Sequence, residues 1–535
     1  KMMEEFGYAP VRLPLAHSAH ILEGDALTEV DPASGEQVDR DWSKVLSVTA
    51  QDVADGVRVY IAGNPPFAGQ GKGGNTEEEK EAKKRAMMLA WGKDYAGYLD
   101  FATAWFAKTA RYLKTLQEQC EIFGVAEVPG EFAFVSTNSI VQGKLVPLLF
   151  GPLFRDGWRL KFAYRSFPWE SEAAGKAAVH CVITGFTRSV APENSRTVRV
   201  FDYDWTTRQT VEQKPVHSLN AYLMSDGPNV LVVDSSVPRS SQLPTVSAGS
   251  KPSDGGKLIV KPGDYPIVVA DPIAARYVRP FIGAEELLHA KERWCLWLVH
   301  ATEEEIASSP VLSDRVAGVA KKRSLSSKKA TRLKAATPHL FDENHQPTDT
   351  YICIPRHVSA ERPYFIVKYL PAGTISSDAV FTAVDSDGFV FAIISSSMFI
   401  TWQRTIGGQI KSDFRFANTV VWNNLPLPQI SEEQRRKVIA AGRKVLAARE
   451  AIEERAGKPV SLADMYASLA TMDPALRAAH DELDSAVDVA FGASRRCSSD
   501  EARLKILFER YQELTAAEEA AKPAKKPRAR RRTAK

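Results

Sequence analysis

An apolar run that ends in a rigid turn is the most constraining feature of this 535-residue sequence. Residues 57–62, Val-Arg-Val-Tyr-Ile-Ala, have the length and β-branched composition of a buried strand, and Gly63 ends it. The string Asn64-Pro65-Pro66-Phe67 follows directly. Because two prolines fix φ, the polar groups of this string are positioned before any ligand arrives. The pattern predicts a strand with preorganised acceptors at its carboxyl end.

This string suits methyl transfer to an exocyclic amino nitrogen of a nucleobase. Such a nitrogen is a poor nucleophile because its lone pair is delocalised into the ring. The side-chain oxygen of Asn64 and the carbonyl of Pro65 could accept its two hydrogens and draw the lone pair out of the plane. Phe67 offers a flat face on which an extruded base can stack. The alternative interpretation is a rigid turn after a strand, without a catalytic role.

The composition excludes some other classes of protein. Hydrophobic residues make up 44% and charged residues 25% of the sequence, as in an ordinary globular protein. No stretch approaches the roughly 20 apolar residues of a membrane span, and no basic-then-apolar leader is visible, so we expect no membrane partner and a cytoplasmic location. The cysteines form no CxxC pair, which predicts reduced thiols and neither a metal site nor a disulfide framework; they are Cys120, Cys181, Cys295, Cys353 and Cys497.

The net charge of +4 hides an uneven distribution. Residues 522–535 carry eight Lys or Arg and no acid, which leaves −4 on the rest of the chain. By composition this tail is disordered, and it would add salt-dependent attraction to phosphates. A solubilising tail without a specific partner is the alternative. If the acidic body binds DNA, its basic residues must be concentrated locally.

The chain divides into three regions that differ in their pattern of apolar and polar residues. Up to about residue 190 strands and helices alternate, and from 191 to 430 short apolar runs are broken by Pro, Gly, Ser and Asp. Residues 431–521 are Ala-rich and amphipathic. We expect strands at 19–27, 57–62, 131–137, 159–166 and 177–186, and helices at 98–116, 142–155, 432–456, 461–490 and 499–520, with a helical period also at 283–299. The helix at 98–116 would bury one face, formed by Leu99, Ala102, Phe106, Ala110 and Leu113.

Several strings, in this order, resemble the MmeI-like adenine-N6 DNA methyltransferases. These are the modification halves of single-chain type IIG and IIL restriction–modification enzymes and related defence methylases. Besides Asn64-Pro65-Pro66-Phe67, the strings are FAYRSFPWESEAAGKAAVHCVITGF (162–186), NAYLMSDGPNVLV (220–232), PSDGGKLIV (252–260), VRPFIGAEELLHAKERWCLWL (278–298), KKATRL (328–333) and GGQIKSDFRFANTVVWNNLPLP (407–428). The resemblance covers about residues 20–500. It implies an α/β fold: a partial class I (Rossmann-like) methyltransferase domain (1–190), a β-rich irregular target-recognition domain (191–430) and a helical C-terminal domain (431–521).

The resemblance also implies roles for single residues. Asn64, Pro65, Pro66 and Phe67 match the catalytic motif. Asp25 matches the position that contacts the adenine part of the cofactor S-adenosyl-L-methionine, although it could equally form a turn, and Ala26 and Asn64 are further candidates for cofactor binding. Phe167 or Trp169 matches the second aromatic around the flipped base. We prefer Phe167, and core packing is the alternative for both.

Double-stranded DNA is the partner that the resemblance implies. The candidate contacts lie in the region 191–430 and comprise Lys321, Lys322, Arg323, Lys328, Lys329, Arg332, Lys411, Arg415 and Asn418. The first six form a basic patch suited to phosphates, and a solvated surface explains them almost as well. Amide and guanidinium groups suit base edges, but the sequence does not indicate which bases are read.

The sequence departs from the family pattern in two respects. Members carry an upstream Phe-x-Gly-x-Gly-like strand–turn–helix that holds the methionine part of the cofactor, then an acidic residue for the ribose, and neither is found here. The Gly-rich string 69–74 follows the Asn64–Phe67 motif and suits a flexible loop. No part matches the Asp/Glu-x-Lys nuclease site of restriction members, so a nuclease would be fused upstream or separate. We therefore expect the C-terminal portion of a larger enzyme that does not methylate alone.

Three rival functions remain. Enzymes that methylate a glutamine amide of a protein share the tetrapeptide, but they lack a long recognition domain. The β-rich recognition region and the basic tail fit an enzyme that acts on a duplex better than they fit an RNA adenine methyltransferase. A non-catalytic, sequence-specific DNA-binding subunit is favoured by the missing cofactor motif and disfavoured by the intact Asn64–Phe67 string.

Overall fold

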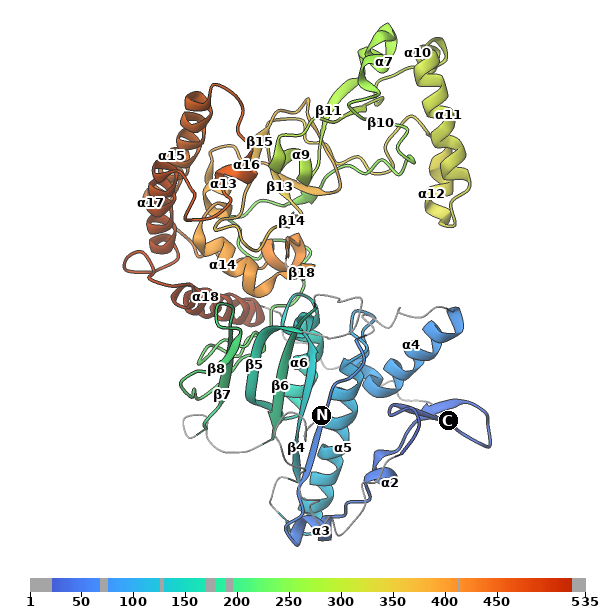
Figure 1. Ribbon diagram of the computed structural model, residues 1–535, viewed down its shortest axis with the longest axis vertical. Coiled ribbons are helices and arrows are strands. Elements are labelled where there is room, and N and C mark those ends of the chain that lie inside the picture. Colours follow the sequence, from blue (N-terminus) through green and yellow to red (C-terminus); the bar gives the residue numbers. More distant parts are fainter. Residues whose placement is uncertain are drawn as a thin grey trace, which may run out of the picture. The chain divides into compact units, whose positions relative to one another are not determined.

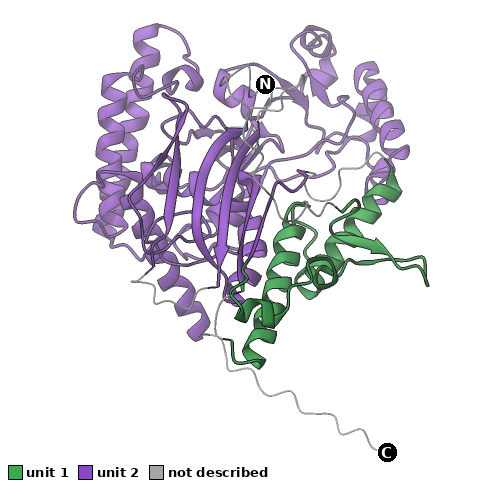
Figure 2. Cartoon of the chain, turned by 60° about the horizontal axis from the view of Figure 1, so that its bottom comes forward, with its two compact units in different colours: residues 1–58, 68–129 green, residues 59–67, 130–535 purple. Residues whose placement is uncertain are grey.

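The computed structural model describes residues 22–67, 76–125, 129–169, 179–188, 196–410 and 413–521. The chain divides into two compact units (Figure 2). Unit 1 comprises residues 1–58 and 68–129, and unit 2 comprises residues 59–67 and 130–535. The Asn64–Phe67 motif therefore belongs to the same unit as the residues that follow position 130.

Unit 1 is mainly helical. Its elements are β1 (Thr28–Val30), β2 (Gln37–Asp39), α2 (Trp42–Leu46), α3 (Ala50–Ala54), α4 (Glu77–Trp91), the 3₁₀ turn η1 (Gly92–Asp94) and α5 (Thr103–Ile122). The face predicted for the helix at 98–116 is buried throughout, which confirms it, but the helix itself begins at Thr103 and extends to Ile122. The strand expected at 19–27 is not observed from residue 22 on, and residues 19–21 lie outside the described ones. The reason is local: Asp25 Oδ1 accepts a hydrogen bond from the backbone N–H of Leu27 at 2.8 Å and closes a turn.

A sheet of six strands forms the first part of unit 2 (Figure 1). Its strands are β3 (Val59–Gly63), β4 (Gly130–Thr137), β5 (Arg159–Trp169), β6 (Val179–Thr187), β7 (Arg199–Asp204) and β8 (Gln209–Glu212). Their order in the sheet is β3-β4-β6-β5-β7-β8. The pairs β3–β4 and β5–β7 are parallel, and the other pairs are antiparallel. Between β4 and β5 the chain forms η2 (Asn138–Val141) and α6 (Leu145–Arg155).

The sheet continues beyond the domain boundary expected at residue 190. Strand β7 pairs with β5 over three residues, and β8 pairs with β7 over four. Strand β8 was missed because it is exposed along its whole length and lacks the apolar run by which a buried strand is recognised. Close neighbours leave no room for a side chain at two glycines of the sheet. A Cβ at Gly130 would lie 2.0 Å from the Val59 carbonyl oxygen, and one at Gly185 would lie 2.1 Å from the Phe162 ring.

The recognition region is irregular and β-rich, as expected, with short helices between its strands. Its strands form three small sheets, ordered β10-β12-β11-β16, β15-β13-β17-β9 and β14-β19-β18. The strands are β9 (Ser247–Ala248), β10 (Ile259–Val260), β11 (Val278–Ile282), β12 (Trp294–Leu296), β13 (Tyr351–Pro355), β14 (His357–Val358), β15 (Lys368–Leu370), β16 (Ile375–Ser376), β17 (Val380–Ala383), β18 (Gly408–Ile410) and β19 (Asp413–Arg415). The helical pieces are α7 (Tyr265–Ala270), α8 (Pro272–Ala275), α9 (Ala284–His289), α10 (Glu303–Ser308), α11 (Pro310–Ser324), α12 (Lys329–Leu333), η4 (Lys334–Ala336), α13 (Phe389–Ile394), α14 (Ser397–Ile406) and η5 (Asn418–Trp422). The helical period expected at 283–299 holds only for α9, because Ala290 adopts a left-handed conformation (φ 52°) and ends the helix.

The C-terminal region is helical, as predicted. It comprises α15 (Glu432–Ala456), α16 (Leu462–Met465), α17 (Pro474–Ala490) and α18 (Asp500–Ala521). Helix α15 matches the expected bounds because Ser431 and Gln434 form a capping box and Gly457 ends the helix in a left-handed conformation. The helix expected at 461–490 is two helices, since Asp473 caps a new start with Pro474 in its first turn.

Buried polar groups join this helical region to the recognition region. His480 on α17 is fully buried and stacks on Tyr364, with ring centroids 3.8 Å apart. The Tyr466 hydroxyl accepts a hydrogen bond from Arg449 Nε at 2.8 Å and forms a second hydrogen bond with His480 Nε2, also at 2.8 Å. Burial, together with the nearby Arg449 charge, holds the pKa of His480 well below 6.5.

This buried histidine predicts acid sensitivity of unit 2. Below pH 6.5 the unfolded chain binds a proton at His480 that the folded chain does not, so stability is present above that pH and is lost as the pH falls. The slope contributed by this one group approaches about 1.4 kcal/mol per pH unit. Urea unfolding at pH 7.0 and 5.5 measures it, and His480→Phe, which keeps an aromatic ring against Tyr364, should lose less stability on acidification than the native chain. Equal losses in both proteins would contradict the prediction.

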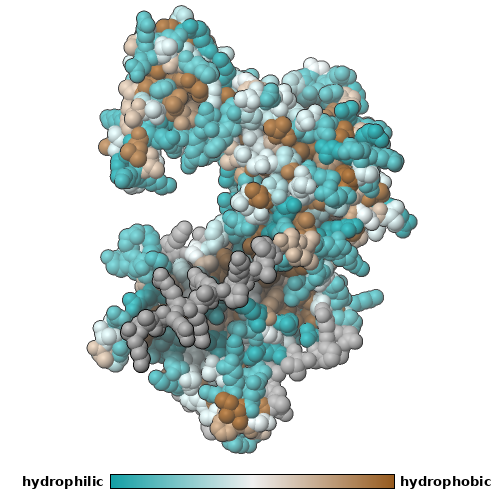
Figure 3. Space-filling view, turned by 180° about the vertical axis from the view of Figure 1, so that it is seen from behind, coloured by the Kyte–Doolittle hydropathy of each residue, from teal (hydrophilic) through white to brown (hydrophobic). Residues whose placement is uncertain are grey.

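All five cysteines are free thiols, and four of them are buried. Across the described ranges no helix is long and apolar enough to cross a membrane. The same residues contain no group of three or more His, Cys, Asp or Glu placed to hold a metal ion. On the face shown in Figure 3 hydrophilic side chains predominate and apolar ones form scattered patches.

Candidate active site

The Asn64–Phe67 motif lies directly beyond the paired part of β3. The parallel ladder between β3 and β4 ends with Gly63 opposite Phe134, so the motif continues from the carboxyl end of the strand. Pro65 is buried, whereas Asn64 and Pro66 are exposed and Phe67 is 37% exposed. The buried proline anchors the turn, and the amide of Asn64 and the ring of Phe67 remain accessible.

Phe167 and Trp169 lie at the same edge of this sheet. Thr137 at the end of β4 is opposite Cys181, and Cys181 is opposite Phe167 near the end of β5. Three strand spacings separate β3 from β5, or about 14 Å between backbones. Two aromatic side chains can approach a planar base from opposite sides over such a spacing. Phe167 is half-buried and Trp169 is 39% exposed, so the structure leaves both available and the choice of Phe167 stays a prediction.

The thiol nearest to this edge is not suited to nucleophilic catalysis. Burial raises the pKa of Cys181 to about 11, so the thiol is protonated at neutral pH. Cys181 is therefore not a candidate nucleophile at this edge.

A polar bridge at this edge was not predicted. The side-chain nitrogen of Asn138, the residue after β4, donates to Ser166 Oγ at 3.1 Å and to Gln409 Oε1 at 3.2 Å. Ser166 precedes the candidate aromatic Phe167, and Gln409 belongs to β18 of the recognition region. The sequence signal is the polar run 136–139 directly after the apolar part of a strand, but nothing local indicates the distant partner.

Asp25 and Ala26, the predicted cofactor contacts, belong to unit 1. Besides the Leu27 N–H, the Asp25 carboxylate accepts a hydrogen bond from the Thr28 hydroxyl at 2.7 Å. The Ala26 carbonyl accepts one from Trp42 Nε1 at 2.8 Å. Asp25 is thus a turn former, and because it is exposed and a carboxylate has further lone pairs, it can also accept from an amino group.

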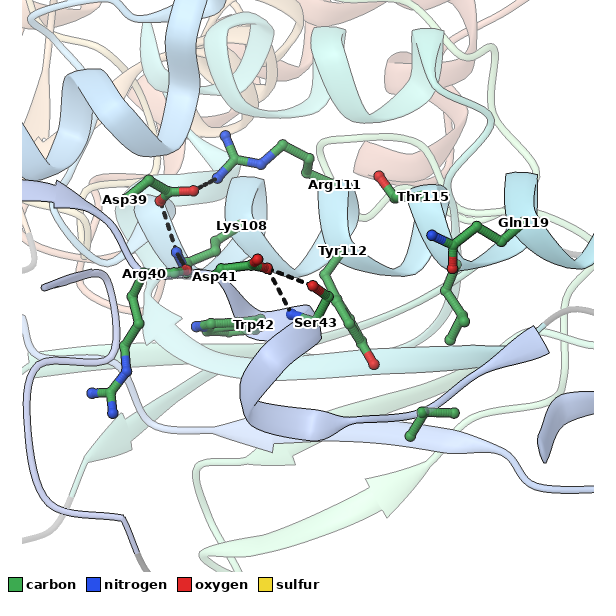
Figure 4. Close-up of a pocket in the computed structure, with 12 residues that line it drawn as sticks. Asp39, Arg40, Asp41, Trp42, Ser43, Lys108, Arg111, Tyr112, Thr115 and Gln119 are labelled. Carbon is green, nitrogen blue, oxygen red and sulfur yellow. Dashed lines mark hydrogen bonds and ion pairs between the residues drawn. The ribbon is translucent and has the colours of Figure 1, made fainter. Parts of the chain in front are cut away.

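Unit 1 also contains a cavity of about 230 Å³ between the segment that follows β2 and helix α5 (Figure 4). Asp39 pairs there with Lys108 at 2.7 Å and with Arg111 at 2.6 Å. Lys108 also donates to the carbonyls of Leu27 and Arg40, and burial lowers its pKa. The carboxylate, the two cations and the two carbonyls are thus hydrogen-bonded to one another. These bonds hold the β1–β2 hairpin against α5. None of the predicted site residues lines this cavity.

The basic patch predicted to bind DNA is exposed with one exception. Lys321, Lys322, Lys328, Lys329 and Arg332 are exposed at the end of α11 and along α12. Arg323 is wrong as a DNA contact, because it is fully buried. Its guanidinium nitrogens donate to five backbone carbonyls, those of Pro252, Ser253, Lys334, Thr337 and Leu340. Arg323 therefore holds three chain segments together and has no nitrogen left for phosphate.

The second group of predicted DNA contacts lies at and after the β18–β19 hairpin. Arg415, on β19, is exposed, and Lys411 lies outside the described residues. The Asn418 side-chain amide donates to the Val246 carbonyl at 2.9 Å, so a structural bond occupies this donor and Asn418 is a weaker candidate than Arg415.

Comparisons with known proteins agree with this architecture. Three family models match consecutive parts of the chain: the MmeI DNA-methyltransferase domain at residues 1–201, the MmeI target recognition domain at 226–429 and the MmeI C-terminal domain at 430–518. DNA methyltransferase A of Bacillus subtilis (strain 168) is 32% identical over 477 residues, which are 89% of this chain and 49% of that protein. A solved structure of the type IIL restriction–modification enzyme MmeI in complex with DNA matches with a TM-score of 0.79 and 32% identity, over 96% of this chain and 62% of that one.

A methyltransferase sheet followed by a recognition domain and a helical domain defines the class of protein. The chain belongs to the MmeI family of DNA methyltransferases. It spans about half the length of the curated relative it matches.

Proposed function

We propose that this chain provides the target-base site and the DNA-reading surface of an adenine-specific DNA methyltransferase that acts in restriction–modification or phage defence in the cytoplasm. The cofactor would be S-adenosylmethionine and the substrate the exocyclic amino group of an adenine within a specific duplex sequence. The observation that carries the proposal is the placement of Asn64 and Phe67. Both are accessible at the carboxyl end of a parallel strand, in the same compact unit as a target recognition domain.

Catalysis in this site comes mainly from holding the adenine amino group in the right orientation. The flipped adenine stacks on Phe67, and the Asn64 side-chain oxygen and the Pro65 carbonyl accept its two amino hydrogens. When bound, S-adenosylmethionine would supply a methyl group on a sulfonium; the nitrogen lone pair would form the new N–C bond, and the electron pair of the S–C bond would stay on sulfur. The nitrogen is then cationic and loses a proton to solvent, so no strong base is needed. The two acceptor dipoles face the positive charge as it develops.

The residues present fit the adenine end of the cofactor, as the exposed carboxylate of Asp25 can accept from its amino group. The Gly-rich strand–turn–helix that would hold the methionine end has no counterpart in this sequence. We therefore propose that turnover needs such a segment in addition, and kinetic tests should use the full-length protein.

The test of the proposed function combines two measurements on one DNA library. Incorporation of tritiated methyl groups from S-adenosylmethionine reports catalysis, and a gel shift reports binding. Sequence-specific incorporation supports the methyltransferase. Binding without incorporation by the full-length protein would instead support a non-catalytic specificity subunit.

The exposed part of the basic patch predicts salt-dependent DNA binding. Replacing Lys321, Lys322, Lys328 and Lys329 together with glutamine should weaken binding to all duplexes alike. The slope of log affinity against log salt concentration should fall by about 0.9 for each phosphate that the variant no longer neutralises. A matched control replaces Lys437 and Lys444, which pair with Glu433 at 2.6 Å and Glu482 at 2.5 Å on the helical region. An unchanged slope in the fourfold variant would remove this patch from the DNA interface.

A further inference from the structure

We propose that Asn138 is a positioning residue that couples DNA reading by the β18–β19 hairpin to capture of the target base. This inference rests on the proposed function, because it assigns a role to Asn138 in placing that base for methyl transfer. It concerns a residue that touches neither base nor cofactor and acts through two neighbours.

The hydrogen bonds of the Asn138 side-chain amide connect three parts of unit 2. Asn138 itself directly follows β4, the strand beside β3 and the Asn64–Phe67 motif. One N–H points to Ser166, whose neighbour Phe167 is the candidate second aromatic, and the other points to Gln409 on β18. A planar amide provides two donors in fixed directions, and the acceptors here are a hydroxyl and an amide oxygen. An aspartate has the same shape but no donor.

The base of the hairpin is held close to the loop that contains Asn138. The Gly143 N–H donates to the Ile406 carbonyl at 3.0 Å, just before β18 begins. Gly143 has a φ of 61°, a conformation that favours glycine, and a Cβ there would lie 3.7 Å from Gly408. Within the hairpin Gly408 is opposite Arg415, the exposed candidate for DNA contact. The hairpin therefore has one end fixed to the catalytic sheet and presents an exposed cation.

The expected consequence is kinetic rather than structural. Two side-chain hydrogen bonds between neutral groups contribute too little to stability for their loss to unfold a domain of this size. A displacement of about 1 Å at the reacting atoms can instead slow a reaction by about a hundredfold. If Asn138 sets the distance between the reading hairpin and the base-holding strand end, its removal should lower kcat while DNA binding remains.

The experiment compares Asn138→Ala, Asn138→Asp, Gln409→Ala and the double variant Asn138→Ala/Gln409→Ala in the full-length protein. Methyl incorporation into a duplex with the target site gives kcat and KM, a gel shift gives the Kd for DNA, and thermal unfolding reports the fold. The control is Asn344→Ala, which changes an exposed asparagine of the recognition region whose side chain accepts a local hydrogen bond from the Gln346 N–H at 3.2 Å.

We expect kcat to fall tenfold to a hundredfold in Asn138→Ala and at least as much in Asn138→Asp, with KM and Kd within about threefold of the native values. Gln409→Ala should show a smaller loss, and the double variant should lose little beyond Asn138→Ala, because both residues act through one contact. Gln409→Ala also keeps the proposal testable if the Asn138 variants do not fold.

Two results would overturn the coupling while leaving the proposed function intact. One is a kcat within twofold of native in Asn138→Ala when Asn64→Ala abolishes transfer. The other is a double variant whose losses multiply, since the two residues would then act independently. No incorporation by the native full-length protein would remove both the proposed function and this inference from it.

Discussion

Replacing Asn64 with alanine in the full-length protein is expected to lower the rate of methyl transfer by at least about a hundredfold, the cost of losing one preorganised partner of a developing charge. The side chain is exposed beyond the β3 ladder, so its loss should not disturb the sheet. DNA binding should stay close to native, because the recognition region is untouched. Single-turnover incorporation of tritiated methyl groups measures the rate, and a gel shift measures the binding.

Two further variants sharpen this test. Asn64→Asp keeps an acceptor oxygen and should retain more activity than alanine, although its charge alters the site. Phe67→Leu removes the flat face but not the acceptors, and should lower both base capture and rate. An Asn64→Ala protein that turns over at the native rate would remove the motif from the mechanism and favour the rigid-turn interpretation.

The largest loss of stability is expected for Arg323→Ala. The buried guanidinium donates to five backbone carbonyls from residues 252–253 and 334–340, and alanine removes all five of these hydrogen bonds and opens a cavity. Together these effects should reduce the free energy of unfolding by about 3 to 4 kcal/mol. Chemical denaturation followed by tryptophan fluorescence measures the change.

Neighbours of Arg323 on α11 provide the comparison. Lys321→Ala changes an exposed side chain of the same predicted patch and should alter stability by less than about 0.5 kcal/mol. It should weaken DNA binding, whereas Arg323→Ala should affect binding only through unfolding. Equal stability of the two variants would show that the five carbonyl bonds do not matter in solution.

Local sequence patterns predicted the elements whose signals are local. The apolar run before Gly63 predicted β3, and Ser431 with Gln434 predicted the start of α15. The split between α16 and α17 also had a local signal, Asp473-Pro474, which the continuous amphipathic pattern obscured. In contrast, β8 carries no apolar alternation and is held only by its pairing with β7, so its own sequence does not reveal it.

The same distinction explains the candidate site. Asn64–Phe67 could be proposed from the sequence because the chemistry expected of it lies within four consecutive residues. Arg323 was misassigned because the carbonyls that bury it come from residues 252–253 and 334–340, which no window around it contains. Asn138 was missed because Gln409 is 271 positions away. Residue type and spacing predict a site only when the fold brings no distant partner to it.

Mass spectrometry of nucleosides tests the central claim most directly. DNA from cells that express the full-length protein, and from cells that express its Asn64→Ala variant, is digested and compared at equal expression. We predict N6-methyladenine in the first sample and only background in the second. A different methylated nucleoside in the first sample, or N6-methyladenine at equal levels in both, would contradict the assignment of this motif to adenine methylation.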